Sequence, residues 1–383
     1  MARKELSGNK GEWSEIYVFL YLLAHGRLVV ADEDLNAIPN EFYKILAILR
    51  KEAETSNNYI REDDKVNIIV RNDKTQEMEE FSFPVVDFIK KANQLLNELK
   101  ATTSMKHPEI TDFLSQLKIY SIKDVGHKRD ITIKIEDFHN GMPQTLGFSI
   151  KSFLGANSTL FNPAPGTNFI YEVIPPEGVE IDVDKFNADT YPIRGRIAAR
   201  IQSLLHDFNC SIAFVKTQSN CLYQNLRTID GDMPDLLSRL LIARFEQDMK
   251  SVQKVTQYIT KLNPYGFDIE SHGEVYQYKV KRFLQDCAMG MTPETPWTGI
   301  YDATGGQIIV KEDGEVVCYH IYEINRFLEY LYKSTIFEGA STGEDESNPG
   351  HPRPEAKKNY FYGWLYKEHE RYFIKLNLQV RFK

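Results

Sequence analysis

The sequence predicts an α/β fold in which helices flank a central mixed sheet. Segments with helical spacing of apolar residues, such as 11–25, occur along the chain together with segments of alternating apolar and polar residues, such as 131–136. The 383 residues are 42% hydrophobic and 26% charged, which is the composition of an ordinary globular protein. The 21 Tyr and 22 Phe are enough to build β-rich cores.

The first third is expected to be mostly helical. Ile16, Tyr17 and Leu20 recur at helical spacing within residues 11–25, and Gly26 is placed to end that helix. The other elements predicted here are a helix at 40–54, a hairpin at 66–83, and helices at 84–100 and 108–117.

The rest of the chain alternates strands with helices and becomes β-rich towards its end. The predicted strands are 131–136, 146–153, 169–174, 210–215, 307–310, 316–320, 360–366 and 372–382, and the predicted helices are 192–207, 233–249, 251–262 and 275–288. We expect a central sheet of the strands at 130–136, 145–153, 169–174 and 210–215, flanked by the helices at 11–25 and 192–207. Three regions follow: a mostly helical 1–118 that contributes the helix 11–25 to the site, a core at 119–289, and a β-rich 290–383.

Charge and cysteine content exclude several classes of protein. The formal net charge of −8 excludes a protein that coats nucleic acid by bulk charge, although it leaves room for a locally basic groove. Four cysteines without a CxxC pair argue against a disulfide framework and against a cysteine-based zinc site. No apolar run approaches the roughly 18 residues of a membrane span, so we expect no membrane partner and a cytoplasmic location.

The hairpin at 130–151 carries the most informative chemistry. A two-residue turn at Asn140-Gly141 would place Asp130 opposite Lys151, on the face away from the isoleucines. Pro143 would lengthen the turn and shift this register by one or two residues. Taken alone, the pair is explained as well by a surface ion pair, worth about 0–1 kcal/mol.

An Asp and a Lys on neighbouring strands also form the layout of the PD-(D/E)xK nucleases. In that layout Asp130 would hold a divalent metal, and Lys151 would orient or deprotonate the attacking water. Ser149 departs from the pattern, which has an acid at this position. Because Mg²⁺ usually takes one or two carboxylates together with water and phosphate oxygens, a second acid is needed.

Glu12 is the first candidate for that second acid. It borders the apolar side of the predicted helix 11–25, whereas Glu15 is expected to point further away into solvent. Glu172, on the following strand, is the alternative. Each of these acids can also be explained as an ordinary surface charge.

Five blocks of sequence resemble the HpaII family of type II restriction endonucleases. They are GNKGEWSEIYVFLYLLAHG (8–26), GFSIKSFLGANSTLFN (147–162), TNFIYEV (167–173), GMTPETPWTG (290–299) and NLQVRF (377–382). The resemblance implies a PD-(D/E)xK core and Mg²⁺-dependent cleavage of double-stranded DNA at a short palindrome. It also implies CCGG as the target, 5′-phosphate ends, and a cognate DNA methyltransferase as genetic partner. A palindromic target suits a two-fold homodimer.

Two other functions remain open. A catalytically silent DNA-binding protein on the same fold is compatible with Ser149, and an α/β scaffold unrelated to DNA would make the Asp130 and Lys151 pair purely structural.

DNA contacts are predicted from basic and amide side chains, with the C-terminal region as an arm that embraces DNA. The candidates for phosphate contact are Arg194, Arg196 and Arg200, and those in the loop after the catalytic strand are Asn157, Asn162 and Asn168. Solvated helix faces and ordinary turns explain the same residues equally well.

Overall fold

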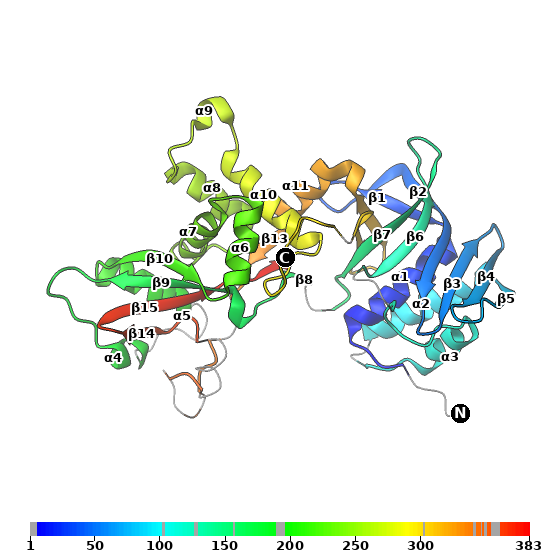
Figure 1. The fold of residues 1–383 in the computed structure, drawn as a ribbon, viewed down its shortest axis with the longest axis horizontal. Coiled ribbons are helices and arrows are strands. Elements are labelled where there is room, and N and C mark those ends of the chain that lie inside the picture. The colour runs from blue at the N-terminus through cyan, green and yellow to red at the C-terminus, as the bar shows by residue number, and fades with distance from the viewer. Residues whose placement is uncertain are drawn as a thin grey trace. The chain divides into compact units, whose positions relative to one another are not determined.

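The protein folds into two compact units, each built from two segments of the chain (Figure 1). The computed structural model describes residues 6–383 except 102–103, 126–128, 156–157, 189–195, 302, 340–341, 346, 348–350 and 354–360. The first unit comprises Met1–Ser158 and Tyr301–Tyr330, and the second comprises Thr159–Ile300 and Leu331–Lys383. This division differs from the three consecutive regions that the sequence suggests.

A mixed sheet of nine strands forms the first unit, in the order β1-β12-β11-β7-β6-β2-β3-β4-β5. Its strands are β1 (Arg27–Ala31), β2 (Ala37–Lys51), β3 (Thr55–Arg61), β4 (Lys65–Asn72), β5 (Met78–Pro84), β6 (Ile131–Glu136), β7 (Pro143–Ser152), β11 (Gly306–Val310) and β12 (Val316–His320). The pairs β1–β12 and β11–β7 are parallel. Because β1 also pairs with β2, six of the strands close into a ring.

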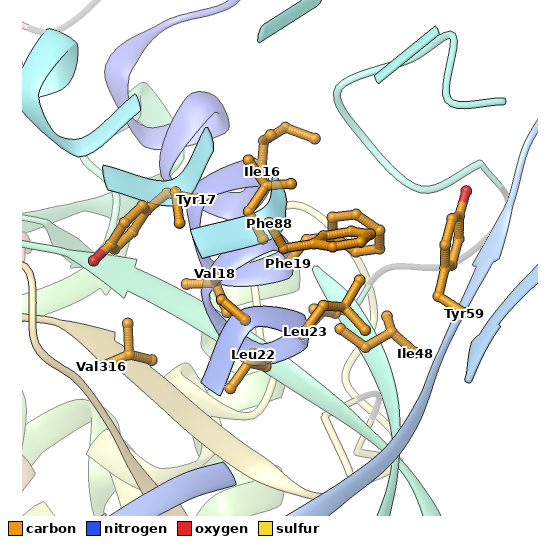
Figure 2. Close-up of a cluster of buried hydrophobic side chains, with 14 of the residues drawn as sticks. Ile16, Tyr17, Val18, Phe19, Leu22, Leu23, Ile48, Tyr59, Phe88 and Val316 are labelled. Carbon is orange, nitrogen blue, oxygen red and sulfur yellow. The ribbon is translucent and has the colours of Figure 1, made fainter. Parts of the chain in front are cut away.

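Helix α1 (Lys10–His25) is the centre of this unit's core. It packs against α2 (Val85–Ala101) and the sheet, and α3 (Pro108–Gln116) adds to the same apolar cluster. Tyr17 and Phe19 point in opposite directions from α1, and both are buried (Figure 2). Full burial of such a side chain stabilises the fold by roughly 1.5–3 kcal/mol. α1 is therefore enclosed on most of its circumference.

Both ends of α1 are defined by the local sequence. Asn9 caps the first turn and forms a capping box with Glu12. Gly26 ends the helix in the left-handed conformation, with a φ of 66°, as predicted. Among the residues with a described structure, no helix is long and apolar enough to cross a membrane.

The second unit contains two antiparallel sheets covered by helices. Its strands are β8 (Thr159–Phe161), β9 (Asn168–Ile174), β10 (Ser211–Thr217), β13 (Thr335–Phe337), β14 (Leu365–Glu368), β15 (Arg371–Asn377) and β16 (Val380–Phe382). Its helices are α4 (Val183–Ala188), α5 (Arg196–Gln202), α6 (Asn220–Ile229), α7 (Met233–Glu246), α8 (Val252–Leu262), α9 (Ile269–His272) and α10 (Val275–Ala288). α11 (Ile324–Ser334) begins in the first unit and ends in the second.

Several predictions about the fold are wrong. The first third is not mostly helical, because β1 to β5 lie in it beside α1, α2 and α3, and the helix predicted at 192–207 to flank the central sheet lies in the second unit, where its described part begins with α5. Residues 40–54 form most of β2 rather than a helix, because pairing with β6 and β3 on its two sides outweighs the local helical spacing. The strands at 169–174 and 210–215 are β9 and β10 of the second unit, not members of the central sheet. The predicted hairpin at 66–83 and the helices that follow it are confirmed as β4–β5, α2 and α3.

Candidate active site

The β6–β7 hairpin holds Asp130 and Lys151 in a register shifted by two residues from the predicted one. Ile131 pairs with Phe148 rather than Ile150, because the turn extends from Asp137 to Met142. The same register brings Asp130, one residue before β6, to the level of Ser149. Its Oδ2 accepts a hydrogen bond from the backbone N–H of Ile150 at 2.6 Å. The carboxylate of Asp130 is thus fixed to the backbone of the strand that carries Lys151.

Lys151 lies on β7 without a direct ion pair to Asp130. Burial lowers the pKa of the Lys151 ammonium, and the negative charges of Asp130 and Glu15 oppose this effect. No hydrogen bond or ion pair joins the ammonium to another residue in the described ranges. The exposed ion pair considered from the sequence is therefore not what the structure contains, and Lys151 keeps its three donors for another group.

Glu15 is the acid that α1 brings to Asp130. Both residues line one small pocket together with Arg50 and Asp124. Burial, and next the charge of Asp130, raise the pKa of Glu15 to about 8. The expectation that Glu15 points into solvent is wrong. It assumes a helix with one apolar side and one solvated side, whereas α1 is buried on most sides.

Glu12 is occupied in other interactions. Its Oε2 accepts a hydrogen bond from the backbone N–H of Asn9 at 2.9 Å, and its Oε1 lies 3.1 Å from Nζ of Lys123. Burial acts to raise the pKa of Glu12, but these two partners hold it below its usual value. One carboxylate oxygen thus completes the helix cap, and the other pairs with Lys123.

Glu172 belongs to the second unit. It lies on β9, where its Oε2 is 3.3 Å from Nη1 of Arg371 on the neighbouring strand β15. Of the three acids weighed from the sequence, Glu15 is the one that shares a pocket with Asp130.

Two contacts hold the first turns of α1 against the end of β7. The Oγ of Ser14 donates to Oγ of Ser152 at 2.8 Å, and Nζ of Lys10 donates to the carbonyl of Leu154 at 3.3 Å. The first of these contacts ties the residue before Glu15 to the residue after Lys151. The position of Glu15 therefore follows from the packing of the helix on the strand.

Sequence reasoning missed one polar residue of this sheet, Gln307. β11 runs parallel to β7, with Gln307 beside Ser149 and Ile309 beside Lys151. The side chain of Gln307 is 1% exposed, and both of its polar atoms lack a hydrogen-bond partner within the described part of the chain. The only signal in the local sequence that points to Gln307 is its position as a polar residue at the start of the apolar run Ile308 to Val310.

Arg200 does not contact phosphate as predicted, because it is fully buried in the second unit. Its Nη1 donates to the carbonyl of Gly363, its Nη2 donates to the carbonyl of Asn187 at 3.0 Å, and its guanidinium lies 4.1 Å from the centre of the Trp364 ring. Arg196 and Arg200 are four residues apart, so they lie on one side of α5, and this side faces the interior of the second unit. Arg196 itself forms an ion pair with Glu344.

The asparagines differ in their exposure. Asn162 is exposed just after β8, and its contact with DNA stays a prediction. Asn168 is fully buried, where it donates to Gln218 at 3.1 Å and accepts from Asn377 at 2.8 Å, so it is a structural residue. Asn157 and Arg194 lie outside the described residues.

Replacement of Arg200 by Met is expected to destabilise the protein by about 2–4 kcal/mol, because two buried carbonyls lose their donors and the contact with Trp364 is lost. The midpoint of chemical denaturation, followed by tryptophan fluorescence and circular dichroism, measures the loss. Arg239→Met is the control, since its 2.7 Å ion pair with Asp235 is largely exposed and should contribute at most about 1 kcal/mol. Equal losses from the two variants would contradict the structural role.

The donor set of the pocket suits Mg²⁺. Glu15 and Asp130 supply two carboxylates, and Mg²⁺ binds through one or two carboxylates while it keeps several waters. Groups of three or more His, Cys, Asp or Glu residues are absent from the described ranges, so the site does not have the closed ligand set of a structural zinc. The pKa of Glu15 is raised first by burial and next by the charge of Asp130, and a bound cation would favour the charged form of both acids.

Comparison with known proteins identifies the family. Residues 9–382 match the family model described as HpaII restriction endonuclease. The type II restriction enzyme HpaII of Haemophilus parainfluenzae is 36% identical over 381 residues, which cover 98% of each chain. No solved structure matches. The chain belongs to the HpaII restriction endonuclease family, whose members are site-specific deoxyribonucleases.

Proposed function

We propose that the protein hydrolyses phosphodiester bonds of double-stranded DNA with Mg²⁺ at a short palindrome, CCGG, and leaves 5′-phosphate ends. The observation that carries this proposal is the grouping of Asp130, Glu15 and Lys151 in a chain of a restriction endonuclease family. The match to HpaII over 98% of the chain supports CCGG as the first target to test. In this proposal Glu15 takes the place of the acid that the PD-(D/E)xK pattern has at the position of Ser149.

The proposed mechanism assigns one role to each charged side chain. Asp130 and Glu15 would hold Mg²⁺, which when bound stabilises negative charge on the phosphate. Lys151 donates hydrogen bonds to the attacking water and holds it in line with the leaving 3′ oxygen. The water oxygen forms the new bond to phosphorus and releases one proton to solvent, the bond from phosphorus to the 3′ oxygen breaks, and that oxygen takes up one proton from solvent. The products are a 5′-phosphate and a 3′-hydroxyl.

The lowered pKa of Lys151 supports this role. Burial lowers the pKa of its ammonium, and a more acidic N–H is a stronger hydrogen-bond donor to a water molecule. The backbone hydrogen bond to Asp130 supports the metal role as well, because it fixes one carboxylate oxygen and leaves the other available.

The proposal extends to partners and location. Double-stranded DNA is the substrate, a cognate DNA methyltransferase would protect the host sequence, and two copies of the chain would read the two halves of a palindrome. Such an enzyme works in the cytoplasm. Asn162 is the described residue of the predicted loop that remains available for DNA contact.

Ser149 supports a second function. A chain without an acid at this position would bind DNA specifically and leave it uncut if Glu15 does not replace that acid. Specific binding without Mg²⁺ and without cleavage would identify this alternative.

Digestion of an unmethylated plasmid of known sequence tests the proposed function. The plasmid is incubated with purified protein in Mg²⁺ and in EDTA, and the fragment ends are sequenced. Discrete fragments that appear only with Mg²⁺ and end at CCGG are expected. Ends at another sequence would overturn the target, and intact DNA with folded protein that still binds it would favour the silent binder.

A further inference from the structure

A line of polar side chains crosses from β7 to β11 beside the proposed active site. Ser149 and Lys151 are two residues apart on β7 and share one face of the sheet. Gln307 lies in register with Ser149 on the adjacent strand, so its side chain stands on that same face. Ile309 lies directly beside the lysine on β11, and the hydroxyl of Ser149 and the carboxamide of Gln307 lie on the same face, two residues earlier on their two strands.

Gln307 has unsatisfied hydrogen-bonding capacity in a buried place. Its side chain is 1% exposed, and neither Oε1 nor Nε2 has a partner among the residues that the structure describes. Buried polar groups in native proteins are nearly always hydrogen-bonded, since an unmade bond costs free energy. A glutamine kept in this position therefore points to a bound group that completes its hydrogen bonds.

The backbone next to this glutamine, at the start of β11, is tightly constrained. Gly306 has a φ of 112°, and a Cβ on it would lie 2.0 Å from the carbonyl oxygen of Tyr319. A side chain at position 306 is thus excluded, and β12 can pair tightly with β11 up to this residue. The backbone of Gln307 is consequently held in place by the residue that precedes it.

The chemistry of the neighbours indicates what Gln307 binds. The Lys151 ammonium has three donors and no acceptor, so a water held by Lys151 needs an acceptor for one of its own protons. Ser149 supplies only a hydroxyl where the nuclease pattern has a carboxylate. We propose that Oε1 of Gln307 accepts a hydrogen bond from the attacking water beside Lys151 and takes over this part of the missing acid's work. The inference rests on the proposed nuclease function and adds a residue to it.

Two substitutions at Gln307 test the inference through the single-turnover cleavage rate on a mapped DNA fragment and through the denaturation midpoint. Gln307→Met keeps the shape and removes the acceptor, and it should slow cleavage by about 100-fold, the size expected for one preorganised hydrogen bond in the transition state. Its denaturation midpoint should stay the same or rise, because an unsatisfied amide is removed. Gln307→Glu keeps an acceptor and should retain the wild-type rate to within about 10-fold.

Asn57→Leu is the matched control, because Asn57 is a buried amide of the same sheet whose Nδ2 donates to Tyr59 and Lys118. It should lower the midpoint and leave the rate of the folded protein unchanged. If wild type cuts and Gln307→Met cuts within about threefold of it, or if Gln307→Met loses stability as Asn57→Leu does, Gln307 is structural and the inference fails alone. If wild type does not cut, the nuclease function and this inference fail together.

Discussion

Asp130→Asn should lower the single-turnover cleavage rate by about 10³-fold or more while specific DNA binding persists. Asparagine keeps an oxygen that can accept the 2.6 Å hydrogen bond from Ile150, so the local fold should survive. It loses the negative charge that the proposed Mg²⁺ site requires, and a metal contributes several kcal/mol of charge stabilisation at such a site. Because each 1.36 kcal/mol is tenfold in rate, the expected loss corresponds to roughly 4 kcal/mol.

The control for this variant is Asp137→Asn, at the other end of β6. Asp137 is buried, whereas Asp130 is half-buried, and the Oδ1 of Asp137 accepts from the backbone N–H of His139 within the turn. This change should alter stability and leave the cleavage rate of the folded enzyme near that of wild type. DNA binding is followed by electrophoretic mobility shift in EDTA. If the Asp130→Asn protein still cuts at the wild-type rate, Asp130 is not part of the active site.

Local signals in the sequence predict the elements around the site but not their pairing. Gly26 ends α1 as expected, and the strands at 131–136 and 146–153 are present as β6 and β7. The register between them could not be derived, because it depends on hydrogen bonds inside the turn, including those that Asp137 receives from Gly141 and His139. A two-residue shift keeps the same residues on the same face, so the predicted placement of Asp130 and Lys151 on one side does not depend on the register.

The positions of Glu15 and Gln307 depend on contacts distant in sequence. A helical wheel predicts that Glu15 is solvated because it assumes one buried side, whereas α1 is covered by both α2 and the sheet. Gln307 joins Ser149 only through the parallel pairing of β11 with β7, more than 150 residues apart in the chain. Arg200 shows the reverse error, since a basic residue on a short helix is read as solvated until its buried carbonyl partners are known.

Glu15→Gln should abolish most of the Mg²⁺-dependent cleavage, whereas Glu12→Gln should leave it nearly intact. Both substitutions remove one negative charge from α1 and keep the side-chain shape. Glu15 shares its pocket with Asp130, so its loss should lower the rate by about 10²-fold or more and raise the Mg²⁺ concentration needed for half-maximal rate. Glutamine at position 12 can still complete the capping box with Asn9, and only the partly exposed ion pair with Lys123 is lost, at about 1 kcal/mol or less.

Cleavage rates measured across a series of Mg²⁺ concentrations distinguish the two acids. A metal ligand changes the concentration dependence, whereas a helix-capping residue changes only the denaturation midpoint. If Glu12→Gln shifts the Mg²⁺ requirement and Glu15→Gln does not, the first expectation from the sequence is right and the pocket shared by Glu15 and Asp130 is not the metal site. If Glu15→Gln alone shifts it, the second acid of this nuclease comes from α1 one helical turn beyond the residue that the pattern suggested, and Ser149 needs no carboxylate.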